Sequence, residues 1–478
     1  MKLTELLKGV EVISKVKNTK VSDITDDTRK VKKGSVFVCI KGANFDGHTA
    51  AAEMLKKGAA AVICEYSLGL KKEVVVKNTR SAYSIMCANF FSNPADELKL
   101  IGLTGTNGKT TSTYLIKSLL ESAGKKVGLI GTMQNMIGDE VFETSYTTPT
   151  AYELQSLFRK MADAGCEYCV MEVSSQALAQ GRVDGLHFSV AVFTNLTQDH
   201  LDFHGSMENY RAAKKILFKR TDIAIINKDD ESGAFMAEGL ACKVVTYSVK
   251  DNSADFVAKN ITLTSKGITY ELLGNGIIDR VKCPIPGKFT VYNSLAAACV
   301  AVSVGIDFGT VCAAFKNVSG VKGRIEVVPT DTDYTVIIDY AHSPDGLINI
   351  LSSVKEFAEN RVIAVFGCGG DRDRNKRPKM ADAAASLADF VVLTSDNPRT
   401  EDPEQIVKDA AEGLKGHKID KKIIVDRTEA IRFALNEAKA GDVIVLAGKG
   451  HETYQIIGKE KRHYDEREIV SSILAGEI

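Results

Sequence analysis

The sequence has no long hydrophobic run, no excess of charge of either sign and no paired arrangement of cysteines. Its 478 residues carry 61 Lys and Arg against 61 Asp and Glu, which gives a formal net charge of zero. No global electrostatic field therefore attracts nucleic acid or an anionic membrane. No apolar stretch is long enough to span a bilayer. We expect neither a nucleic-acid partner nor a membrane partner.

The ten cysteines are scattered, and several lie in apolar strand-like runs. This pattern favours buried thiols in a reducing cytoplasm over disulfides. Cys166 and Cys169 form one CxxC pair, but no second pair or His cluster accompanies them, so a structural pair is favoured over a zinc or redox site. Residues 1–20 alternate charged and apolar residues without the apolar core of a signal peptide. We therefore expect a cytoplasmic protein.

The length predicts about three domains, because 478 residues are too many for one hydrophobic core. Short apolar runs alternate with helical stretches along most of the chain, which is typical of parallel α/β sheets. Turn-rich or glycine-rich segments at 92–94 and 320–324 suggest the boundaries. We predict a small α/β domain over 1–98, a central parallel-sheet domain over 99–321 and a Rossmann-like α/β domain over 322–478.

The strongest local signal lies at 98–120, where an apolar strand runs into a glycine-rich turn, Gly105 to Thr111, and then into helical spacing. Strand, turn, Lys109, Thr110 and helix is the P-loop arrangement: backbone N–H groups cradle phosphate, the lysine meets the terminal phosphates and the hydroxyl ligates Mg²⁺. Leu103 occupies the position where the usual pattern has its first glycine. An ordinary glycine-rich turn does not need Lys-Thr-Thr at the helix start, so we expect ATP or GTP to bind here.

Polar residues follow the other strands of the central domain. Glu172 ends one predicted strand, where Mg²⁺ bound to a nucleotide would lie, and Asp199 and His200 follow another. A lone histidine is more often structural, but this position opposite a P-loop favours metal binding. From the residues alone Lys214 is an exposed helical lysine, and Asn293 either contacts a base edge or is hydrated.

The C-terminal third carries polar clusters at the ends of four predicted strands: 339–342, 369–374, 396–399 and 448–452. Arg372 and Arg399 lie in neighbouring clusters and can bind a carboxylate through paired N–H donors. Four such clusters at one sheet edge predict a binding cleft.

Together these motifs resemble the Mur ligases of peptidoglycan synthesis, which are ATP-dependent amide-bond-forming enzymes. The resemblance covers essentially the whole chain. It rests on GTNGKTT at 105–111, TTPT at 147–150, MEVSS at 171–175, FTNLTQDHLDFHG at 193–205, YRAAK at 210–214, IINKDD at 225–230, GKFTVYN at 287–293, GRIE at 323–326, DYAHSPD at 339–345, GGDRDRNKRP at 369–378, SDNPRTEDP at 395–403 and GKGHETYQ at 448–455. Within the family, the DNPR form at 396–399 is similar to members that add diaminopimelate as the third amino acid.

The resemblance implies a role for each matching residue near the nucleotide. Lys109, Glu172, His200 and Lys214 would be catalytic, with Lys214 carried as a carbamate (N6-carboxylysine) that supports a second metal. The Mg²⁺ ligands would be Thr110, Glu172, His200 and the Lys214 carbamate. ATP would contact Gly105, Thr106, Asn107, Gly108, Lys109, Thr110, Thr111, Asn293, Arg324 and Asp339.

The resemblance also implies two substrate sites. The N-terminal domain would help to hold the UDP-muramoyl dipeptide, and the C-terminal domain would hold meso-diaminopimelate. The dipeptide site would contain Thr28, Thr147, Thr148, Ser174, Gln180 and Arg182. The diaminopimelate site would contain Arg372, Asp396, Asn397, Pro398, Arg399, Gly448 and Glu452.

The implied reaction phosphorylates the free side-chain carboxylate of the D-glutamyl residue, and the diaminopimelate amine then displaces phosphate. We expect small-molecule substrates and a monomer. The alternatives are a sister ligase, either lysine-adding or of the folylpolyglutamate type, and a P-loop NTPase switch or motor. A switch would respond to a macromolecule, whereas the ligase would release ADP only with both small substrates.

Overall fold

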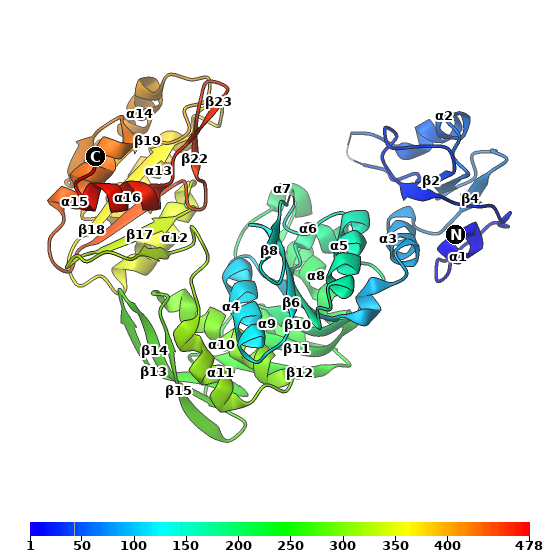
Figure 1. The fold of residues 1–478 in the computed structure, drawn as a ribbon, viewed down its shortest axis with the longest axis horizontal. Helices are drawn as coiled ribbons and strands as arrows, with labels where there is room; N and C mark the ends of the chain where they lie inside the picture. Colours follow the sequence, from blue (N-terminus) through cyan, green and yellow to red (C-terminus); the bar gives the residue numbers. More distant parts are fainter. Residues whose placement is uncertain (43, 145) are drawn as a thin grey trace. The chain divides into compact units, whose positions relative to one another are not determined.

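The computed structural model describes residues 1–42, 44–144 and 146–478. It divides into two compact units, Met1–Val257 with Ala296–Asp307 and Ala258–Leu295 with Phe308–Ile478. Both units are built from sheets covered by helices, so the predicted α/β class is confirmed (Figure 1). The predicted domain limits, 1–98, 99–321 and 322–478, stay predictions.

A small parallel sheet begins the first unit, with strand order β1-β2-β3-β4. Alternate residues of β2 face opposite sides: Val36 and Val38 pack with α1 and α3, and Phe37 packs with α2. The elements are α1 (Leu3–Leu6), β1 (Asp23–Thr25), β2 (Ser35–Val38), α2 (Ala51–Lys56), β3 (Ala61–Cys64), β4 (Glu73–Val75) and α3 (Thr79–Phe90).

The main sheet of the first unit has the parallel order β12-β11-β10-β5-β9-β6, followed by the antiparallel pair β7 and β8. The phosphate-loop strand β5 therefore lies between β10 and β9. The elements are β5 (Lys99–Thr104), α4 (Lys109–Ser122), β6 (Val127–Ile130), β7 (Asn135–Ile137), β8 (Glu140–Phe142), α5 (Ala151–Asp163), β9 (Tyr168–Glu172), α6 (Ser175–Ala179), β10 (Phe188–Phe193), α7 (Leu201–His204), α8 (Met207–Lys215), β11 (Thr221–Asn227), α9 (Gly233–Ala237) and β12 (Lys243–Ser248).

The second unit contains a doubly wound sheet of order β16-β17-β21-β18-β19-β20, parallel except for β16. Helices α12, α13 and α14 cover one face, and α15 and α16 cover the other (Figure 1). Neighbouring residues of one strand belong to opposite cores, as Ile337 and Ile338 of β17 do. The elements are β16 (Glu326–Val328), β17 (Thr335–Asp339), α12 (Pro344–Lys355), β18 (Val362–Cys368), α13 (Lys376–Leu387), β19 (Phe390–Ser395), α14 (Pro403–Ala411), β20 (Asp420–Ile423), α15 (Arg427–Glu437), β21 (Val443–Ala447) and α16 (Glu466–Leu474).

Two features differ from the sequence-based expectations. The apolar residues before Asp426 predict a strand over 422–425, but the edge strand β20 spans Asp420–Ile423, because this strand is exposed and lysine-rich and gives no apolar signal. The antiparallel pair β14 and β15 was not predicted at all. The remaining elements are β13 (Phe256–Thr264), β14 (Gly267–Gly274), β15 (Ile277–Cys283), α10 (Lys288–Ser303), α11 (Phe308–Ala314), β22 (Tyr454–Ile457) and β23 (Glu460–His463).

The cysteines are free thiols, and all except the half-buried Cys242 are buried, which confirms the expected buried thiols. Burial raises the pKa of the Cys166 and Cys169 thiols. Across the parts of the chain that the structure describes, no helix combines the length and the apolar character that crossing a membrane requires.

Candidate active site

The turn between β5 and α4 has the form of a phosphate-binding loop. A Cβ at Gly105 would lie 1.9 Å from Thr194 Oγ1, so this position admits glycine alone. Gly108 adopts a left-handed conformation (φ 84°) and caps α4, whose first turn presents backbone N–H groups. Lys109 Nζ donates to Gly105 O and Thr106 O, both at 2.9 Å. The lysine thus lies folded over the loop that the sequence predicted.

A hydroxyl and a carboxylate meet beside this loop. The register pairs Leu103 of β5 with Glu172 of β9, which brings the end of β9 next to the loop. Thr110 Oγ1 donates to Glu172 Oε1 (2.9 Å), and Glu172 is 1% exposed. The N–H and hydroxyl of Thr132 also donate to this carboxylate, each at 3.0 Å. Hydroxyl and carboxylate oxygens are the donors that Mg²⁺ prefers, so these residues fit the predicted metal.

His200 follows β10 and caps α7 in a left-handed conformation (φ 52°). Its side chain is 45% exposed and its Nε2 lies 3.4 Å from Asp199 Oδ2. Its ring packs edge-on against Tyr210, with centroids 6.2 Å apart, and the Tyr210 hydroxyl lies 3.2 Å from Thr106 Oγ1. Within the described residues, no three His, Cys, Asp or Glu side chains gather around one point. The role of His200 as a metal ligand stays a prediction.

Lys214 is buried, at 2% exposure, so the expectation of an exposed helical lysine was wrong. Tyr210, Ala213 and Lys214 share the inward face of α8, where spacings of three and four residues put side chains together. Lys214 Nζ donates to Gly105 O (2.9 Å), the oxygen that also accepts from Lys109, and lies 4.4 Å from the Tyr210 ring centroid. Burial, and then the charge of Lys109, holds the pKa of Lys214 well below its ordinary value. A neutral amine is therefore favoured at this position.

The structure brings together four of the residues predicted to hold the UDP-linked substrate. Thr148 is buried, its hydroxyl donates to Ser174 Oγ (3.3 Å), and it accepts from Ser174 N (3.0 Å). Arg182 donates to Thr148 O (2.9 Å) and, through two nitrogens, to Gln180 Oε1. Thr147 lies close by, since its Oγ1 lies 3.0 Å from Thr132 Oγ1.

Thr28, the remaining residue of that set, lines a cavity of about 830 Å³ with its neighbours Asp27 and Arg29. Tyr146 also lines this cavity, and its ring centroid lies 5.2 Å from the Arg182 guanidinium carbon. Tyr146 thus connects the cavity to the threonine, serine and arginine network.

Three of the predicted nucleotide contacts, Asn293, Arg324 and Asp339, lie in the second unit. Asn293 is buried at 5% exposure in α10. Asp339 ends β17 and accepts from Ile325 N and Ala341 N, both at 2.9 Å, while burial raises its pKa. The Arg324 guanidinium carbon lies 5.4 Å from the Tyr340 ring centroid.

The predicted cleft of the C-terminal sheet exists as a cavity of about 350 Å³. All four polar clusters contribute to it, because β17, β21, β18 and β19 are parallel neighbours whose carboxyl ends share one edge. Pro398 is buried in the same loop but does not line the cavity. The predicted residues that line it are Arg372, Asp396, Asn397, Arg399, Gly448 and Glu452.

Arg399, the last residue of the 396–399 cluster, adopts a left-handed backbone conformation (φ 51°). Its N–H donates to Ile456 O (3.0 Å), and its Nη1 donates to Gly370 O (2.8 Å). Within the described residues, neither Arg399 nor Arg372 forms an ion pair with a carboxylate. Burial raises the pKa of Glu452, and nearby Arg399 opposes this rise. The cavity therefore offers arginine donors and a carboxylate to one ligand.

Sequence analysis missed several residues of these sites. Thr132, which donates to Glu172, was not predicted, whereas Tyr340 and His342 belong to the predicted 339–342 cluster and line the C-terminal cavity, although no individual role was assigned to them. Lys449, at the end of β21, is fully buried beneath the cavity. Its position between two glycines at a strand end indicates a loop. This pattern does not show that the side chain points inward.

Comparisons with known proteins agree with this geometry along the whole chain. Three family models match in order: "Mur ligase family, catalytic domain" at residues 20–89, "Mur ligase middle domain" at 103–301 and "Mur ligase, glutamate ligase domain" at 323–450. The Clostridium perfringens protein named UDP-N-acetylmuramoyl-L-alanyl-D-glutamate–2,6-diaminopimelate ligase is 47% identical over 489 residues, covering 100% of both chains.

Two further matches cover nearly the whole of both chains. The protein of the same name from Caldanaerobacter subterraneus subsp. tengcongensis is 48% identical over 480 residues, 99% of each chain. A solved structure under that name superposes with a TM-score of 0.76 at 37% identity, covering 96% of this chain and 95% of the other. The chain therefore belongs to the Mur ligase family.

Proposed function

We propose that this protein is the ATP-dependent ligase that joins meso-diaminopimelate to UDP-N-acetylmuramoyl-L-alanyl-D-glutamate, a step of cytoplasmic peptidoglycan precursor synthesis. The observation that carries the proposal is the C-terminal cavity, where Arg372 and Arg399 lie beside Glu452. A ligand with a free carboxylate and an ammonium group at its distal end complements this charge pattern. Relatives of 47% and 48% identity over the full chain carry the name of this reaction.

The first chemical step transfers the γ-phosphoryl group of ATP to the side-chain carboxylate of the D-glutamyl residue. The P–O bond to ADP breaks, a P–O bond to the carboxylate forms, and an acyl phosphate results. Backbone N–H groups of 105–111 hold the phosphates, and Lys109 neutralises charge on the transferring group. Asn293, Arg324 and Asp339 are further proposed contacts of the nucleotide.

In the second step the uncharged amine of diaminopimelate attacks the acyl carbon. The C–N bond forms, the C–O bond to phosphate breaks, and the amine loses a proton as inorganic phosphate leaves. Positioning by the two substrate sites supplies most of the acceleration, because the protein forms no covalent bond with either substrate. The dipeptide is proposed to contact Thr28, Thr147, Thr148, Ser174, Gln180 and Arg182.

Thr110, Glu172 and His200 are the proposed protein ligands for Mg²⁺. When bound, Mg²⁺ supplies positive charge to the phosphate oxygens. Thr110 and Glu172 already lie within 2.9 Å of each other through their oxygens, which supports the pair as part of one site.

Lys214 is the proposed site of carbamate formation. Its Nζ attacks the carbon of CO₂, the new N–C bond forms, and the nitrogen loses a proton to give an anion. The buried position and the lowered pKa of Lys214 support this step, because only the neutral amine reacts. The resulting anion would offset the positive charge of Lys109 and of bound metal.

The direct test incubates the full chain with ATP, Mg²⁺, the UDP-linked dipeptide and meso-diaminopimelate. We expect a UDP-linked tripeptide by mass spectrometry and one ADP for each product molecule. Omission of either small substrate should leave ADP release at background. ADP release that is independent of both small substrates would instead favour the NTPase alternative. The monomeric state and the absence of a nucleic-acid partner stay predictions.

A further inference from the structure

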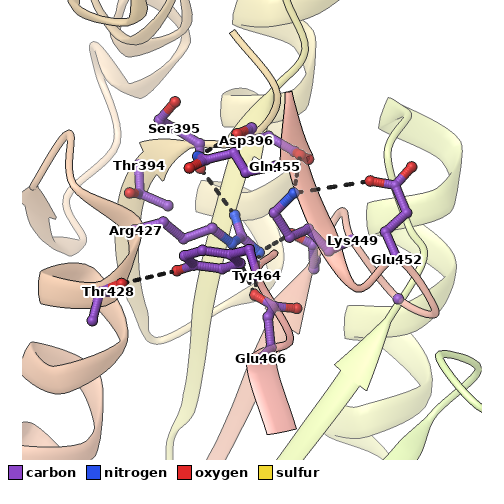
Figure 2. A network of polar contacts seen from close by, with 12 residues as sticks. Thr394, Ser395, Asp396, Arg427, Thr428, Lys449, Glu452, Gln455, Tyr464 and Glu466 are labelled. Atoms are coloured by element: carbon purple, nitrogen blue, oxygen red, sulfur yellow. Dashed lines mark hydrogen bonds and ion pairs between the residues drawn. The ribbon is translucent and has the colours of Figure 1, made fainter. Parts of the chain in front are cut away.

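Lys449 is a buried cation directly beneath the cavity of the second unit. It follows β21, and its side chain is 0% exposed. Its Nζ lies 3.4 Å from Asp396 Oδ1 and 3.9 Å from Glu452 Oε2, and both carboxylates line the cavity. Figure 2 shows the ammonium group of Lys449 between these two residues, with Tyr464 and Arg427 on its other side.

The contacts of Lys449 determine the orientation of the Asn397 amide. Lys449 Nζ and Ile456 N both donate to Asn397 Oδ1, at 3.1 Å and 2.9 Å. Because both are donors only, the oxygen of the amide must face them. Asn397 Nδ2 is then left to donate to Glu452 Oε2, at 2.9 Å. Lys449 therefore orients the side chain of Asn397 and, through it, that of Glu452, and both residues line the cavity.

Lys449 also holds the turn that carries Glu452. Its carbonyl oxygen accepts from Glu452 N (2.9 Å), and its Nζ donates to Tyr454 O (2.8 Å), two residues further on. The loop passes so close to the neighbouring carboxylate that a Cβ at Gly448 would lie 2.5 Å from Asp396 Oδ2. Backbone and side chain of Lys449 thus fix the same segment.

The other buried cation nearby does not duplicate this function. Arg427 donates to Glu466 Oε1, Ser395 O and Ala447 O, so its hydrogen bonds join the helices to the sheet below the loop. Within the described residues, Asp396 Oδ1 has no hydrogen-bond partner, and Lys449 Nζ lies 3.4 Å from it. Removal of Lys449 would leave buried carboxylates without the cation closest to them.

We infer that Lys449 is a positioning residue for the amino-acid substrate: its side-chain nitrogen fixes the Asn397 amide, which in turn holds the Glu452 carboxylate at the cavity. The inference rests on the proposed function, since it assigns this cavity to the amino acid. The positioned Glu452 carboxyl group meets the ammonium group of an incoming zwitterion, and Arg399 meets its carboxylate. Lys449 itself touches neither substrate.

The test compares Lys449→Met with Lys459→Met in the full chain. Methionine fills similar volume without charge or donor, and Lys459 is an exposed lysine of the nearby hairpin turn. Lys449→Met should raise the KM for meso-diaminopimelate about tenfold or more, with kcat and the KM for ATP within about twofold of the unmutated enzyme. Lys459→Met should change none of the three. Lys449→Gln, which can still donate to Asn397 Oδ1, should fall between the two methionine variants.

A second measurement is independent of turnover. Added meso-diaminopimelate should raise the thermal unfolding midpoint of the unmutated chain and of Lys459→Met, but not of Lys449→Met, whereas ATP should stabilise all three. Equal loss of affinity for ATP and for the amino acid would assign Lys449 to general folding and overturn the inference. Failure of both Lys449 variants to fold would do the same.

The two proposals fail in different ways. If the unmutated enzyme releases no ADP with meso-diaminopimelate, the proposed function is wrong. If it does so and Lys449→Met keeps its KM for the amino acid, only the inference about Lys449 is wrong.

Discussion

At the turn after β5, the side-chain nitrogens of Lys109 and Lys214 donate to one backbone oxygen, Gly105 O, whereas the cavity of the second unit combines arginine side chains with carboxylates. Lys109 adds positive charge to the backbone N–H groups of this turn, which suits a polyphosphate. The cavity lined by Arg399 and Glu452 offers charge of both signs, which suits a zwitterion. The two regions therefore differ in the charge pattern that each offers to a ligand.

The regions also differ in how their charged groups are supported. The phosphate loop depends on backbone geometry, since Gly105 and Gly108 admit its close turns. The cavity depends on side chains, since Lys449 and Asn397 hold Glu452 in place. Substitutions in the first region should therefore abolish chemistry, and substitutions in the second should change which amino acid is used.

The largest effect is expected at Lys109. Lys109→Ala should lower kcat about a thousandfold or more, because a charge that stabilises the transferring phosphoryl group is lost. ADP release under saturating substrates measures this. Lys125→Ala, whose lysine forms an exposed ion pair with Glu167, should retain activity. Near-normal turnover by a folded Lys109→Ala protein would remove the basis for assigning phosphates to this loop.

The second-largest effect on turnover is expected at Lys214. Lys214→Ala should lower kcat on the order of a hundredfold, because the carbamate anion is missing beside the metal site. Short carboxylates such as acetate or formate should restore part of the rate by supplying an anion. Lys215→Ala, which changes the neighbouring lysine whose Nζ lies 4.3 Å from the Phe235 ring centroid, serves as the control. A fully active Lys214→Ala enzyme would show that the buried amine has no part in the reaction.

Arg399→Ala should weaken binding of the amino acid, which we assign to the cavity of the second unit, and should leave ATP binding unchanged. We expect the KM for meso-diaminopimelate to rise about thirtyfold, since one to two charge-assisted hydrogen bonds are lost. The KM for ATP should stay unchanged. Arg374→Ala is a matched control, because Arg374 pairs with Glu401 outside the cavity. An equal rise for both variants would contradict the specific role of Arg399.

The smallest expected effect is a change in the stability of the folded protein, caused by substitution of Glu401. Hydrogen bonds from Arg377 lower the pKa of Glu401 to about 2, from an ordinary value of 4.5. A depressed folded-state pKa contributes stability that is present above pH 4.5 and is lost as the pH falls through about 2. Glu401→Gln should lower the unfolding midpoint by about 2–4 °C at pH 7 and progressively less below pH 4.5. Glu412→Gln, which removes an exposed ion pair with Lys415, should change it far less. A pH-independent difference would contradict the assignment.

The sequence predicted the parts of these sites that local pattern determines. Gly105, Lys109 and Thr110 lie within one strand-turn-helix motif, and their arrangement follows from it. The strand-end clusters of the second unit were predicted because parallel strands end at one edge, and Arg399 and Glu452 do line one cavity. The resemblance to the Mur ligases then assigned functional roles to residues whose role the sequence pattern alone left open.

What the sequence did not reveal depends on tertiary packing. Lys214 was expected to be exposed because a lysine gives no apolar signal, yet α8 turns it inward beside Gly105. Lys449 lies in a loop of glycines, and only the surrounding carboxylates of Asp396 and Glu452 show why it is buried. The strand β20 was displaced in the prediction for a related reason, since its exposed lysines carry no periodicity.

The central claim is that the cavity of the second unit selects an amino acid with a distal carboxylate. The most direct measurement is ADP release by the unmutated enzyme with meso-diaminopimelate and lysine side by side, each with the UDP-linked dipeptide. Because lysine would leave the Arg399 guanidinium without its anion, we predict that kcat/KM for diaminopimelate exceeds that for lysine by about a hundredfold or more. Comparable rates with the two amino acids would contradict the account.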